Sequence, residues 1–300
     1  MNFEIVAPST HFYLADLVAH RLDKSLIIPE VKKFADGELE IQFTPNTDFK
    51  GKKVFIIMAT CPPVHDSLIT FALLVHKVRM LGAQEIIGVI PYFGYGRHDK
   101  AQGSLAIIAN IIEATNINKL IVFEPHVADI QSYFSIPVIT VRASDLIATH
   151  IQDNSLHKSS IIAPDQGASA KVIAIAQKIG APYTIFVKER YDHNATKIIT
   201  QLNNEHDRCD QAIIIDDIID TGSTALNTLE HLKSKGYKRV YGYFIHPVFS
   251  RNAQKIIEES GFEKVFVSTS IPLSLSPSKK IELWDMSNVL ADLLKKELLT

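Results

Sequence analysis

The stretch AIIIDDIIDTGST, residues 212–224, decides both the fold and the candidate chemistry of this chain. Its apolar beginning, Ala212–Ile215, is a run of strand type that leads into three carboxylates and then a small, hydroxyl-rich turn. The turn Thr221–Thr224 offers backbone N–H groups, hydroxyls and a helix N-terminus, which together suit a phosphate. Asp216 and Asp217 are acceptors that suit vicinal sugar hydroxyls or a hydrated cation. A phosphorylated sugar would satisfy both halves, whereas the structural alternative is a polar strand-to-helix loop with an N-cap.

The composition is that of an ordinary globular chain. Its 300 residues are 46% hydrophobic and 21% charged, which is enough for two domains. The net charge of −2 and the lack of a long basic block argue against nucleic-acid binding. Two cysteines, Cys61 and Cys209, favour a reducing compartment over a disulfide framework. No signal peptide is visible at residues 1–5, and apolar stretches such as 105–112 are too short to span a bilayer. We therefore expect a cytoplasmic protein with no membrane or nucleic-acid partner.

Short Val/Ile-rich runs alternate with longer segments of helical period, which is the pattern of parallel sheets covered by helices. The runs predict strands at Val54–Met58, Ile86–Ile90, Leu120–Phe123, Ser160–Ala163, Tyr183–Val187, Ala212–Ile215, Val240–Ile245 and Val265–Val267. The helical segments are Ser67–Leu81, Ser104–Ala114, Ser169–Ile179, Thr224–Lys235 and Ala253–Ser260. The fold class is therefore expected to be α/β.

The two halves of the chain resemble each other faintly. Residues 82–93 and 236–249 each begin with a glycine that ends a helix and continue into an Ile/Val/Tyr-rich strand. We expect two tandem α/β domains, 1–145 and 146–300, each a mainly parallel sheet flanked by helices.

Polar segments next to the predicted strands suit a nucleotide. Lys33–Glu38 is a tight acidic turn in which Phe34 could stack on a base while Asp36 and Glu38 accept from an exocyclic amine. The alternative is a plain Asp-Gly turn. In Gly94–Lys100 the glycines free the backbone and the basic side chains supply phosphate-binding charge, although a solvated loop would look similar.

Three further segments suit metal and phosphoryl chemistry. His126 and Asp165 each follow a predicted strand and are natural ligands for a hard cation that carries phosphate oxygens, usually Mg²⁺. Lys188 and Arg190, two residues apart on a mobile loop after a strand, could close over a transferring phosphoryl group. Taken singly, a strand-end histidine is more often structural and a Lys-Glu-Arg run is usually a solvated face.

Because ligands gather at the carboxyl ends of parallel strands, these loops should converge on one site. Neither a nucleophile triad nor a Walker-type GxxxxGK[ST] segment is present in the sequence. Direct in-line transfer of a phosphoryl-type group, without a covalent enzyme intermediate, is therefore favoured.

Over nearly its full length the chain resembles the phosphoribosyl pyrophosphate synthetases, also called ribose-phosphate diphosphokinases. The stretches that carry this resemblance are FADGE at 34–38, TCPP at 60–63, PYFGYGRHD at 91–99, IQSYF at 130–134, PD at 164–165, DDIIDT at 216–221 and HPV at 246–248. The resemblance implies two phosphoribosyltransferase-like (type I) domains that transfer the β,γ-diphosphoryl group of Mg-ATP to the 1-hydroxyl of ribose 5-phosphate. It also implies a homo-oligomer, a dimer or a hexamer.

The same resemblance assigns roles to the candidate residues. The implied ATP contacts are Phe34, Asp36, Glu38, Arg97, His98 and Asp99, with the adenine held from a neighbouring subunit. Mg²⁺ would be positioned by His126 and Asp165, and the transferring group would be stabilised by Lys188 and Arg190. The implied ribose-5-phosphate contacts are Asp216, Asp217, Asp220, Thr221, Gly222, Ser223 and Thr224.

The chain departs from the family pattern in ways that leave the acceptor open. Residues 101–104 lead almost directly into a helix where the family has a longer charged stretch. His98, Glu124, Asp129, Ala168, Ala170 and Gly222-Ser223 replace residues common in the family. The first hypothesis is an orthodox ribose 5-phosphate diphosphokinase, and the second is the same chemistry on a larger acceptor such as ADP-ribose. A non-catalytic regulatory homologue and a simple phosphoribosyltransferase are less favoured, because the catalytic cations and metal ligands are retained and an adenine site is expected.

Overall fold

The structure, a computed structural model, describes residues 2–97, 103–192, 195–203, 209–273 and 278–299, with the backbone alone for 187–203. The chain forms two compact units. Unit 1 comprises Met1–Val141, Thr269–Leu273 and Asp285–Thr300, whereas unit 2 comprises Arg142–Ser268 and Ser274–Trp284. The expected division at 145/146 lies close to the first of these boundaries. The expectation of two contiguous halves is wrong at the C-terminus, because residues 285–300 return to unit 1.

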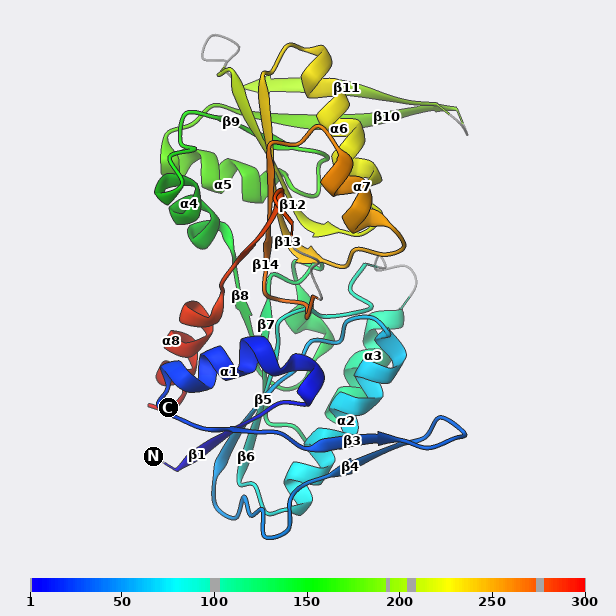
Figure 1. Cartoon of the computed structure of the whole chain (residues 1–300). Helices are drawn as coiled ribbons and strands as arrows, with labels where there is room; N and C mark the ends of the chain where they lie inside the picture. Colours follow the sequence, from blue (N-terminus) through cyan, green and yellow to red (C-terminus); the bar gives the residue numbers. More distant parts are fainter. Residues whose placement is uncertain (1, 98–102, 193–194, 204–208, 274–277, 300) are drawn as a thin grey trace. The chain divides into compact units, whose positions relative to one another are not determined.

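Unit 1 is built on a six-stranded sheet in the order β2-β1-β5-β6-β7-β8, in which every pairing is parallel. Its strands are β1 Phe3–Val6, β2 Leu26–Ile27, β5 Lys53–Ile57, β6 Glu85–Ile90, β7 Lys119–Phe123 and β8 Val138–Val141. A separate antiparallel hairpin, β3 Glu30–Lys33 and β4 Leu39–Gln42, projects from this unit (Figure 1). The helices are α1 Phe12–Arg21, α2 Val64–Met80, α3 Ser104–Glu113 and α8 Ser287–Glu297, with short 3-10 turns η1 Ser9–His11 and η2 Ile130–Tyr133.

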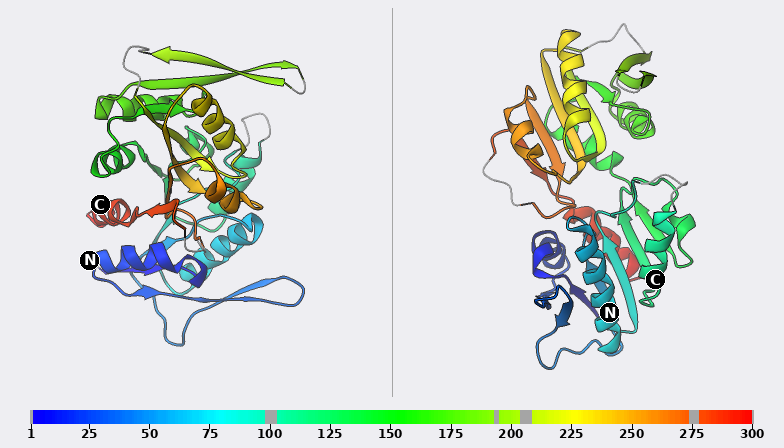
Figure 2. Two further views of the ribbon diagram at one scale, coloured as in Figure 1. Left: turned by 45° about the horizontal axis from the view of Figure 1, so that its top comes forward. Right: turned by 90° about the vertical axis from the view of Figure 1, so that its right-hand side faces the viewer.

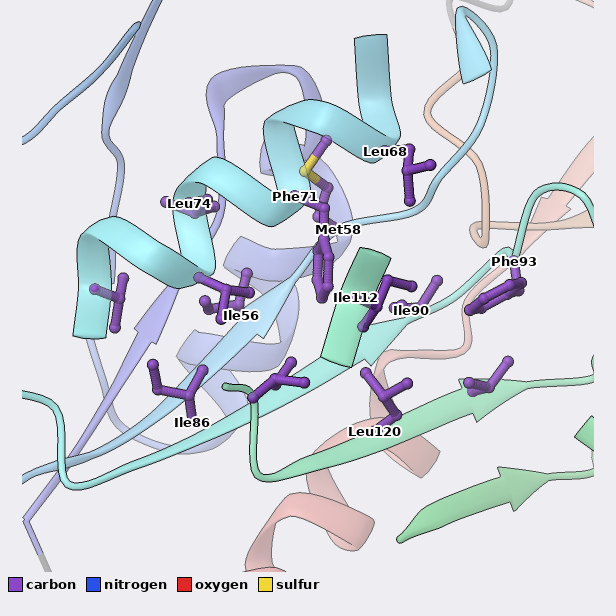
Figure 3. Packing of buried hydrophobic residues seen from close by; sticks show 14 of the residues in the cluster. Ile56, Met58, Leu68, Phe71, Leu74, Ile86, Ile90, Phe93, Ile112 and Leu120 are labelled. Atoms are coloured by element: carbon purple, nitrogen blue, oxygen red, sulfur yellow. The ribbon is translucent and has the colours of Figure 1, made fainter. Parts of the chain in front are cut away.

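Helices α2 and α3 bury one face of this sheet. Phe71 of α2 and Ile112 of α3 pack against Ile56, Ile90 and their neighbours, and these four side chains are fully buried (Figure 3). Gly88 in β6 makes the close approach possible, because a Cβ there would lie 2.7 Å from the Phe71 ring. The even-numbered positions of the central strands β5, β6 and β7 thus form a continuous apolar face, as expected for a sheet covered by helices.

Unit 2 is built on a seven-stranded sheet in the order β11-β10-β9-β12-β13-β14-β15. Its strands are β9 Ser160–Ala163, β10 Tyr183–Asp192, β11 Ala195–Asn203, β12 Gln211–Ile219, β13 Arg239–Pro247, β14 Lys264–Ser268 and β15 Ile281–Trp284. Only the edge pair β10 and β11 is antiparallel, and it forms the long hairpin seen in Figure 2. The helices are α4 Ser144–Asp153, α5 Ser169–Ile179, α6 Ser223–Ser234 and α7 Ala253–Glu259.

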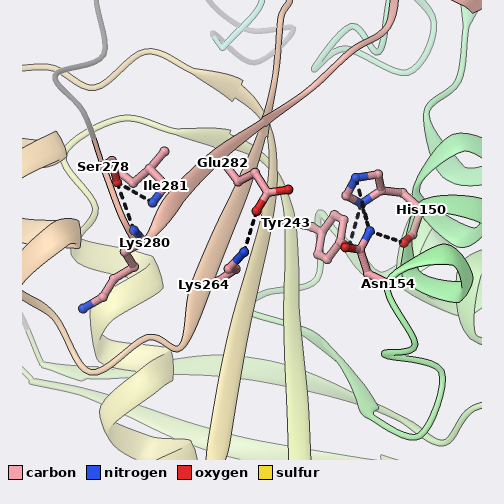
Figure 4. Close-up of polar contacts among 8 residues, drawn as sticks. All are labelled: His150, Asn154, Tyr243, Lys264, Ser278, Lys280, Ile281 and Glu282. Atoms are coloured by element: carbon pink, nitrogen blue, oxygen red, sulfur yellow. Dashed lines mark hydrogen bonds and ion pairs between the residues drawn. The ribbon is translucent and has the colours of Figure 1, made fainter.

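The interior of unit 2 contains a buried tyrosine with a histidine partner (Figure 4). The ring of Tyr243 in β13 stacks on Phe266 of β14 with centroids 4.6 Å apart, and its hydroxyl lies 2.9 Å from His150 Nδ1 on α4. Burial lowers the pKa of His150 and raises that of Tyr243, so both groups are held neutral. This bond ties α4 to the sheet.

The expected fold class, two mainly parallel sheets flanked by helices, is confirmed. The helix expected at Ser169–Ile179 is present with those bounds, and the other expected helices differ by one to three residues at their ends. Elements that the sequence analysis did not predict include α1, α4 and α8 and the short strands β1, β2, β8 and β15. Within the described ranges, no helix combines the length and the apolar character needed to cross a membrane.

Candidate active site

Strand β12 carries the first two carboxylates of the candidate site. The sequence predicts that this strand ends at Ile215, but it runs to Ile219, so Asp216 and Asp217 lie inside it. The strand continues because it stays paired with β13, where Asp216 is opposite Phe244. The two adjacent carboxyls stay close to each other, because a side-chain hydrogen bond with Asp217 is among the causes that raise the pKa of Asp216.

Asp216 lies in a strongly acidic environment. Burial raises the pKa of its carboxyl well above the usual range, and the nearby carboxylates of Asp217 and Asp165 raise it further. A hydrogen bond from the Asp217 N–H to Asp216 Oδ1, at 2.9 Å, acts in the opposite direction. Asp165 follows β9, which neighbours β12 in the sheet, so three predicted site residues are brought together within unit 2. Crowded carboxylates of this kind favour a bound cation or hydroxyl donors.

The turn between β12 and α6 has the geometry expected of a phosphate cradle. Gly222 precedes the helix with φ 81°, a left-handed conformation that favours glycine, and Ser223 begins α6. The hydroxyls of Thr221 and Ser223 lie 3.0 Å apart, and both residues are exposed. The N-cap residue of this 12-residue helix is Gly222, which has no side chain, and the Ser223 N–H makes one long hydrogen bond, 3.5 Å, to Thr221 Oγ1. The first N–H groups of the helix thus face the same turn as the hydroxyls. The predicted segment from Asp220 to Thr224 can therefore bind an anion.

Asp165 is fixed by the loop that follows β9. Its Oδ1 accepts hydrogen bonds from the N–H groups of Gly167 at 2.9 Å and Ala168 at 3.4 Å, just before α5 begins. Asp165 therefore presents a carboxylate of fixed orientation beside Asp216 and Asp217. In the part of the chain that the structure describes, no group of three or more His, Cys, Asp or Glu is arranged to hold a metal. Mg²⁺ is usually bound through one or two carboxylates together with substrate phosphate oxygens and waters.

The prediction of a mobile loop at Lys188 and Arg190 is wrong. Both residues lie within β10, opposite Ile198 and Thr196 of β11 in an antiparallel ladder. The ladder between β10 and β11 continues past Ile185, the last β10 residue that pairs with β9, so this segment is a two-stranded arm at the sheet edge. Positions 188 and 190 share a face of the arm because strand residues two apart do so.

The other predicted site residues lie in unit 1. Phe34, Asp36 and Glu38 form the turn of the β3–β4 hairpin, where the Phe34 side chain is 52% exposed. The turn is closed by a hydrogen bond from the Phe34 N–H to the Glu38 carbonyl at 2.8 Å, and Asp36 Oδ1 accepts from the Glu38 N–H at 3.1 Å. The prediction of a tight acidic turn is confirmed, whereas stacking of a base on the exposed Phe34 ring stays a prediction.

The second predicted ATP segment, Gly94–Lys100, is the loop that follows β6, and the structure describes it up to Arg97. Arg97 is exposed at its end, and His98 and Asp99 lie outside the described residues. The loop is held by Thr60, whose Oγ1 accepts from the Gly94 N–H at 2.7 Å. A Cβ on Gly94 would lie 2.5 Å from the Thr60 carbonyl oxygen, so glycine is required for this contact. The TCPP stretch at 60–63 thus has a structural role, since its first residue fixes the loop after β6.

His126 follows β7 on the same side of unit 1 as the Arg97 loop. Its side chain is exposed, and a Cβ on Gly96 would lie 3.9 Å from His126 Cβ. Two residues before His126, Glu124 is buried with φ 42°. Its N–H donates a hydrogen bond to the Val141 carbonyl at 2.7 Å. The structure thus brings His126 next to the predicted ATP loop. The predicted pairing of His126 with Asp165 joins residues of different units and stays a prediction.

Comparison with known proteins gives matches to both halves of the chain. Residues 3–120 match the family model for the N-terminal domain of ribose phosphate pyrophosphokinase, and residues 203–298 match the phosphoribosyl synthetase-associated domain. The ribose-phosphate pyrophosphokinase of Vibrio parahaemolyticus is 31% identical over 292 residues, covering 94% of this chain and 92% of that protein. The protein of the same name from Buchnera aphidicola is 33% identical over 268 residues, covering 87% and 84%.

The fold has a close counterpart among solved structures. The crystal structure of phosphoribosylpyrophosphate synthetase from Mycobacterium smegmatis superposes with a TM-score of 0.88 at 23% sequence identity and covers 99% of both chains. At this identity the likeness concerns the fold, and its coverage extends over both units.

Proposed function

The chain belongs to the ribose-phosphate pyrophosphokinase family, and we propose that it transfers the β,γ-diphosphoryl group of ATP to the 1-hydroxyl of ribose 5-phosphate. The products are phosphoribosyl pyrophosphate and AMP. The observation that carries this proposal is the segment from Asp216 to Thr224, where carboxylates stand directly before a helix N-terminus with glycine at its N-cap. Ribose 5-phosphate presents vicinal hydroxyls and a phosphate, which are the groups that such a segment binds.

The transfer is a displacement at phosphorus. The 1-hydroxyl oxygen forms a bond to the β-phosphorus of ATP, and the bond from that phosphorus to the oxygen bridging the α-phosphorus breaks. The bridging oxygen leaves with AMP, and the hydroxyl proton passes to water. Because negative charge spreads over the transferring oxygens, catalysis depends on positioning and electrostatic stabilisation.

The sugar is oriented from unit 2. Asp216 and Asp217 accept hydrogen bonds from the ribose hydroxyls, and the turn Thr221–Thr224 with the N–H groups of α6 binds the 5-phosphate. Held at both ends, the sugar has its 1-hydroxyl directed away from the helix. A fixed acceptor removes much of the entropic cost of bringing the two substrates together.

Positive charge for the reaction comes from two sources, the basic side chains of the β10–β11 arm and a magnesium ion. Lys188 and Arg190 on the β10–β11 arm stabilise the transferring group, since both positions lie on one face of the arm. Mg²⁺ is the expected metal, and His126 and Asp165 are its proposed ligands. When bound, this ion neutralises charge on the polyphosphate oxygens. The hydrogen bonds that orient Asp165 support this assignment.

ATP and subunit contacts are proposed for unit 1. Phe34, Asp36 and Glu38 on the exposed turn would hold the adenine of a nucleotide bound to a neighbouring subunit, and Arg97, His98 and Asp99 would contact ATP. A homo-oligomer, either a dimer or a hexamer, follows from this arrangement. The cytoplasmic location stays a prediction that is consistent with two cysteines that form no disulfide.

The test is AMP release from Mg-ATP with ribose 5-phosphate and ADP-ribose assayed side by side. The relatives favour ribose 5-phosphate as the acceptor, so it should be used at least about tenfold better. Lys188→Ala should lower the rate on the order of 10²-fold, by analogy with the loss of one transition-state donor. Lys197→Ala is the matched control, since position 197 pairs with Glu189 on the other face of the arm.

If ADP-ribose were the better substrate, the assignment of ribose 5-phosphate as the acceptor would be wrong, but the diphosphoryl transfer would stand. An absence of AMP with either acceptor would refute the proposed enzyme. An equal loss in Lys188→Ala and Lys197→Ala would show that the arm needs positive charge in general rather than the face that carries Lys188.

A further inference from the structure

The first turn of α2 makes three contacts with different parts of unit 1. His65 Nδ1 is hydrogen-bonded to the hydroxyl of Tyr95 in the loop after β6. Asp66 Oδ2 lies 2.7 Å from Lys33 Nζ at the end of β3. Ser67 donates to the Cys61 carbonyl at 2.7 Å and so anchors the turn to the preceding loop. Two of these contacts reach the two segments of unit 1 to which ATP binding is assigned.

The hydrogen bond between His65 and Tyr95 constrains the backbone that leads to Arg97. Tyr95 has φ 63°, a left-handed conformation that is unusual for a bulky residue and persists only when surrounding contacts impose it. The preceding residue, Gly94, is fixed by Thr60, as described above. The Tyr95 side chain is fixed by His65, whose ring centroid lies 5.9 Å from that of Tyr95. The direction of the chain at Arg97, two residues later, therefore depends on the bond to His65.

The contact from Asp66 acts on the base of the adenine turn. Lys33 is the residue directly before Phe34, and its ion pair with Asp66 is partly exposed, with side chains 55% and 47% accessible. Asp66 also lies in the first turn of a 17-residue helix, where a carboxylate interacts favourably with the helix dipole. The aspartate is thus held in place by its own helix and can restrict the lysine.

We propose that His65 and Asp66 are positioning residues for the nucleotide, because one rigid helical turn sets both the Arg97 loop and the Phe34 turn. Neither residue is assigned a contact with ATP, and each acts through its partner, Tyr95 or Lys33. The inference rests on the proposed function. It adds that changes in the first turn of α2 alter ATP binding before they alter the handling of ribose 5-phosphate, whose predicted contacts lie in unit 2.

A purely structural role is the alternative. His65 is exposed and the Asp66–Lys33 pair is half-exposed, so these contacts are of a kind that contributes little to global stability. If stability were their only role, substitutions would shift the melting temperature and leave nucleotide affinity unchanged. The two roles therefore differ in a measurable quantity.

The experiment measures the Kd of ATP directly, by calorimetry with the intact protein, for His65→Ala, Tyr95→Phe and the double variant. Each single change should weaken ATP binding about 3- to 10-fold, the effect of one lost hydrogen bond. The double variant should lose no more than either single variant, because both changes break the same bond. His65→Asn places an acceptor near the position of Nδ1 and should restore most of the affinity. Asp66→Asn should weaken ATP binding about 2- to 3-fold, as expected for an exposed pair.

Matched controls lie on the helices of the same unit. His76→Ala removes an exposed histidine from the body of α2, and Tyr13→Phe removes the hydroxyl of a tyrosine on α1 that is 58% exposed. Both should leave the Kd of ATP unchanged. In all variants the KM for ribose 5-phosphate should stay within about twofold of the wild type and the melting temperature within about 3 °C.

Unchanged ATP affinity in His65→Ala and Tyr95→Phe would overturn the inference, as would additive losses in the double variant. Failure of the proposed function would have a different signature. In that case the wild-type protein would release no AMP, and the Kd series would still report whether the first turn of α2 positions a nucleotide.

Discussion

Lys119 at the start of β7 and Glu297 at the end of α8 form an ion pair, with Nζ and Oε2 2.5 Å apart, across 178 residues of sequence. Glu297 is 7% exposed, and its carbonyl also accepts a hydrogen bond from Lys53 Nζ at 2.7 Å. Lys53 is in turn paired with Glu85 at 3.1 Å. The C-terminal helix is therefore bound directly to β5 and β7 and, through Lys53, is linked to β6 between them.

This arrangement predicts that the last helix stabilises the first unit. Glu297→Gln keeps the volume of the side chain but leaves Lys119 without its nearby charge, so the free energy of unfolding should fall by about 1–3 kcal/mol. Urea unfolding, followed separately by circular dichroism and by tryptophan fluorescence, is the measurement. Trp284 is the single tryptophan of the chain, so that probe reports on its own surroundings.

Glu259→Gln is the control for this prediction. Glu259 pairs with Lys255 on α7 at 3.8 Å, and both side chains are more than half exposed. Its loss should change the free energy of unfolding by less than about 0.5 kcal/mol. Equal effects of the two substitutions would contradict the importance of the buried pair.

A second prediction concerns the loss of stability of the folded protein at acidic pH. Burial lowers the pKa of His11 from 6.5 to about 4, so the folded protein keeps this imidazole neutral where the unfolded chain binds a proton. As the pH falls from 6.5 towards 4, the unfolded state gains protons first and stability is lost. The loss from this residue is about 3 kcal/mol, from 1.36 kcal/mol for each pH unit between the two pKa values. His150 and His231 have lowered pKa values and act in the same direction.

The free energy of unfolding measured from about pH 7.5 to pH 4 tests this prediction. His11→Gln cannot take up a proton and should show a shallower dependence on pH between 6.5 and about 4. It should also be less stable at neutral pH, since the contacts of His11 with Thr10 and Cys61 are lost. Identical pH slopes for the variant and the wild type would exclude His11 as a source of acid sensitivity.

The two thiols are predicted to differ in reactivity. Cys61 is 5% exposed, and burial raises its pKa to about 11, so almost no thiolate forms near neutral pH. Cys209 is partly exposed. Titration of the native protein with a thiol reagent should modify one cysteine rapidly and the second only after denaturation. Cys209→Ser should remove the fast phase, and a fast phase that survives this substitution would contradict the burial of Cys61.

The strand and helix core of the fold could be predicted because its signals are local. The segment Ser169–Ile179 has a helical apolar period and a glycine after it, and both features are properties of the sequence alone. Helix α8 is different, because its apolar face is buried against α1 and its buried glutamate pairs with a lysine 178 residues earlier. No local signal reports such partners.

In the candidate site, too, some features could be predicted from local sequence and others depend on residues distant in sequence. The turn after β12 could be predicted because its small residues and the helix start follow one another directly in sequence. The placement of Lys188 and Arg190 could not, because the segment becomes a strand only through its pairing with β11. The contact between His65 and Tyr95 also joins residues 30 apart, and neither residue type has a specific role without the other.

The last prediction separates backbone strain from phosphate binding at Gly222. This residue has φ 81°, and a Cβ there would lie 3.4 Å from Ile257 Cδ1, so Gly222→Ala should cost about 1–2 kcal/mol of stability. Because the same residue precedes the first N–H groups of α6, a shift of the turn should also raise the KM for ribose 5-phosphate, on the order of tenfold. The melting temperature and the KM for both substrates are the quantities to measure.

Gly180→Ala provides the matched comparison. Gly180 ends α5 with φ 69°, and no atom lies within 4 Å of the position that a Cβ would take, so alanine meets the same kind of strain without a neighbouring clash. Its stability loss should be similar, whereas its KM for ribose 5-phosphate should stay unchanged. If both variants raised this KM equally, strain in unit 2 would account for the effect, and the turn before α6 would lose its assignment as the phosphate site. If only Gly222→Ala raised it, while the KM for ATP stayed constant, the phosphate would be located at the N-terminus of α6.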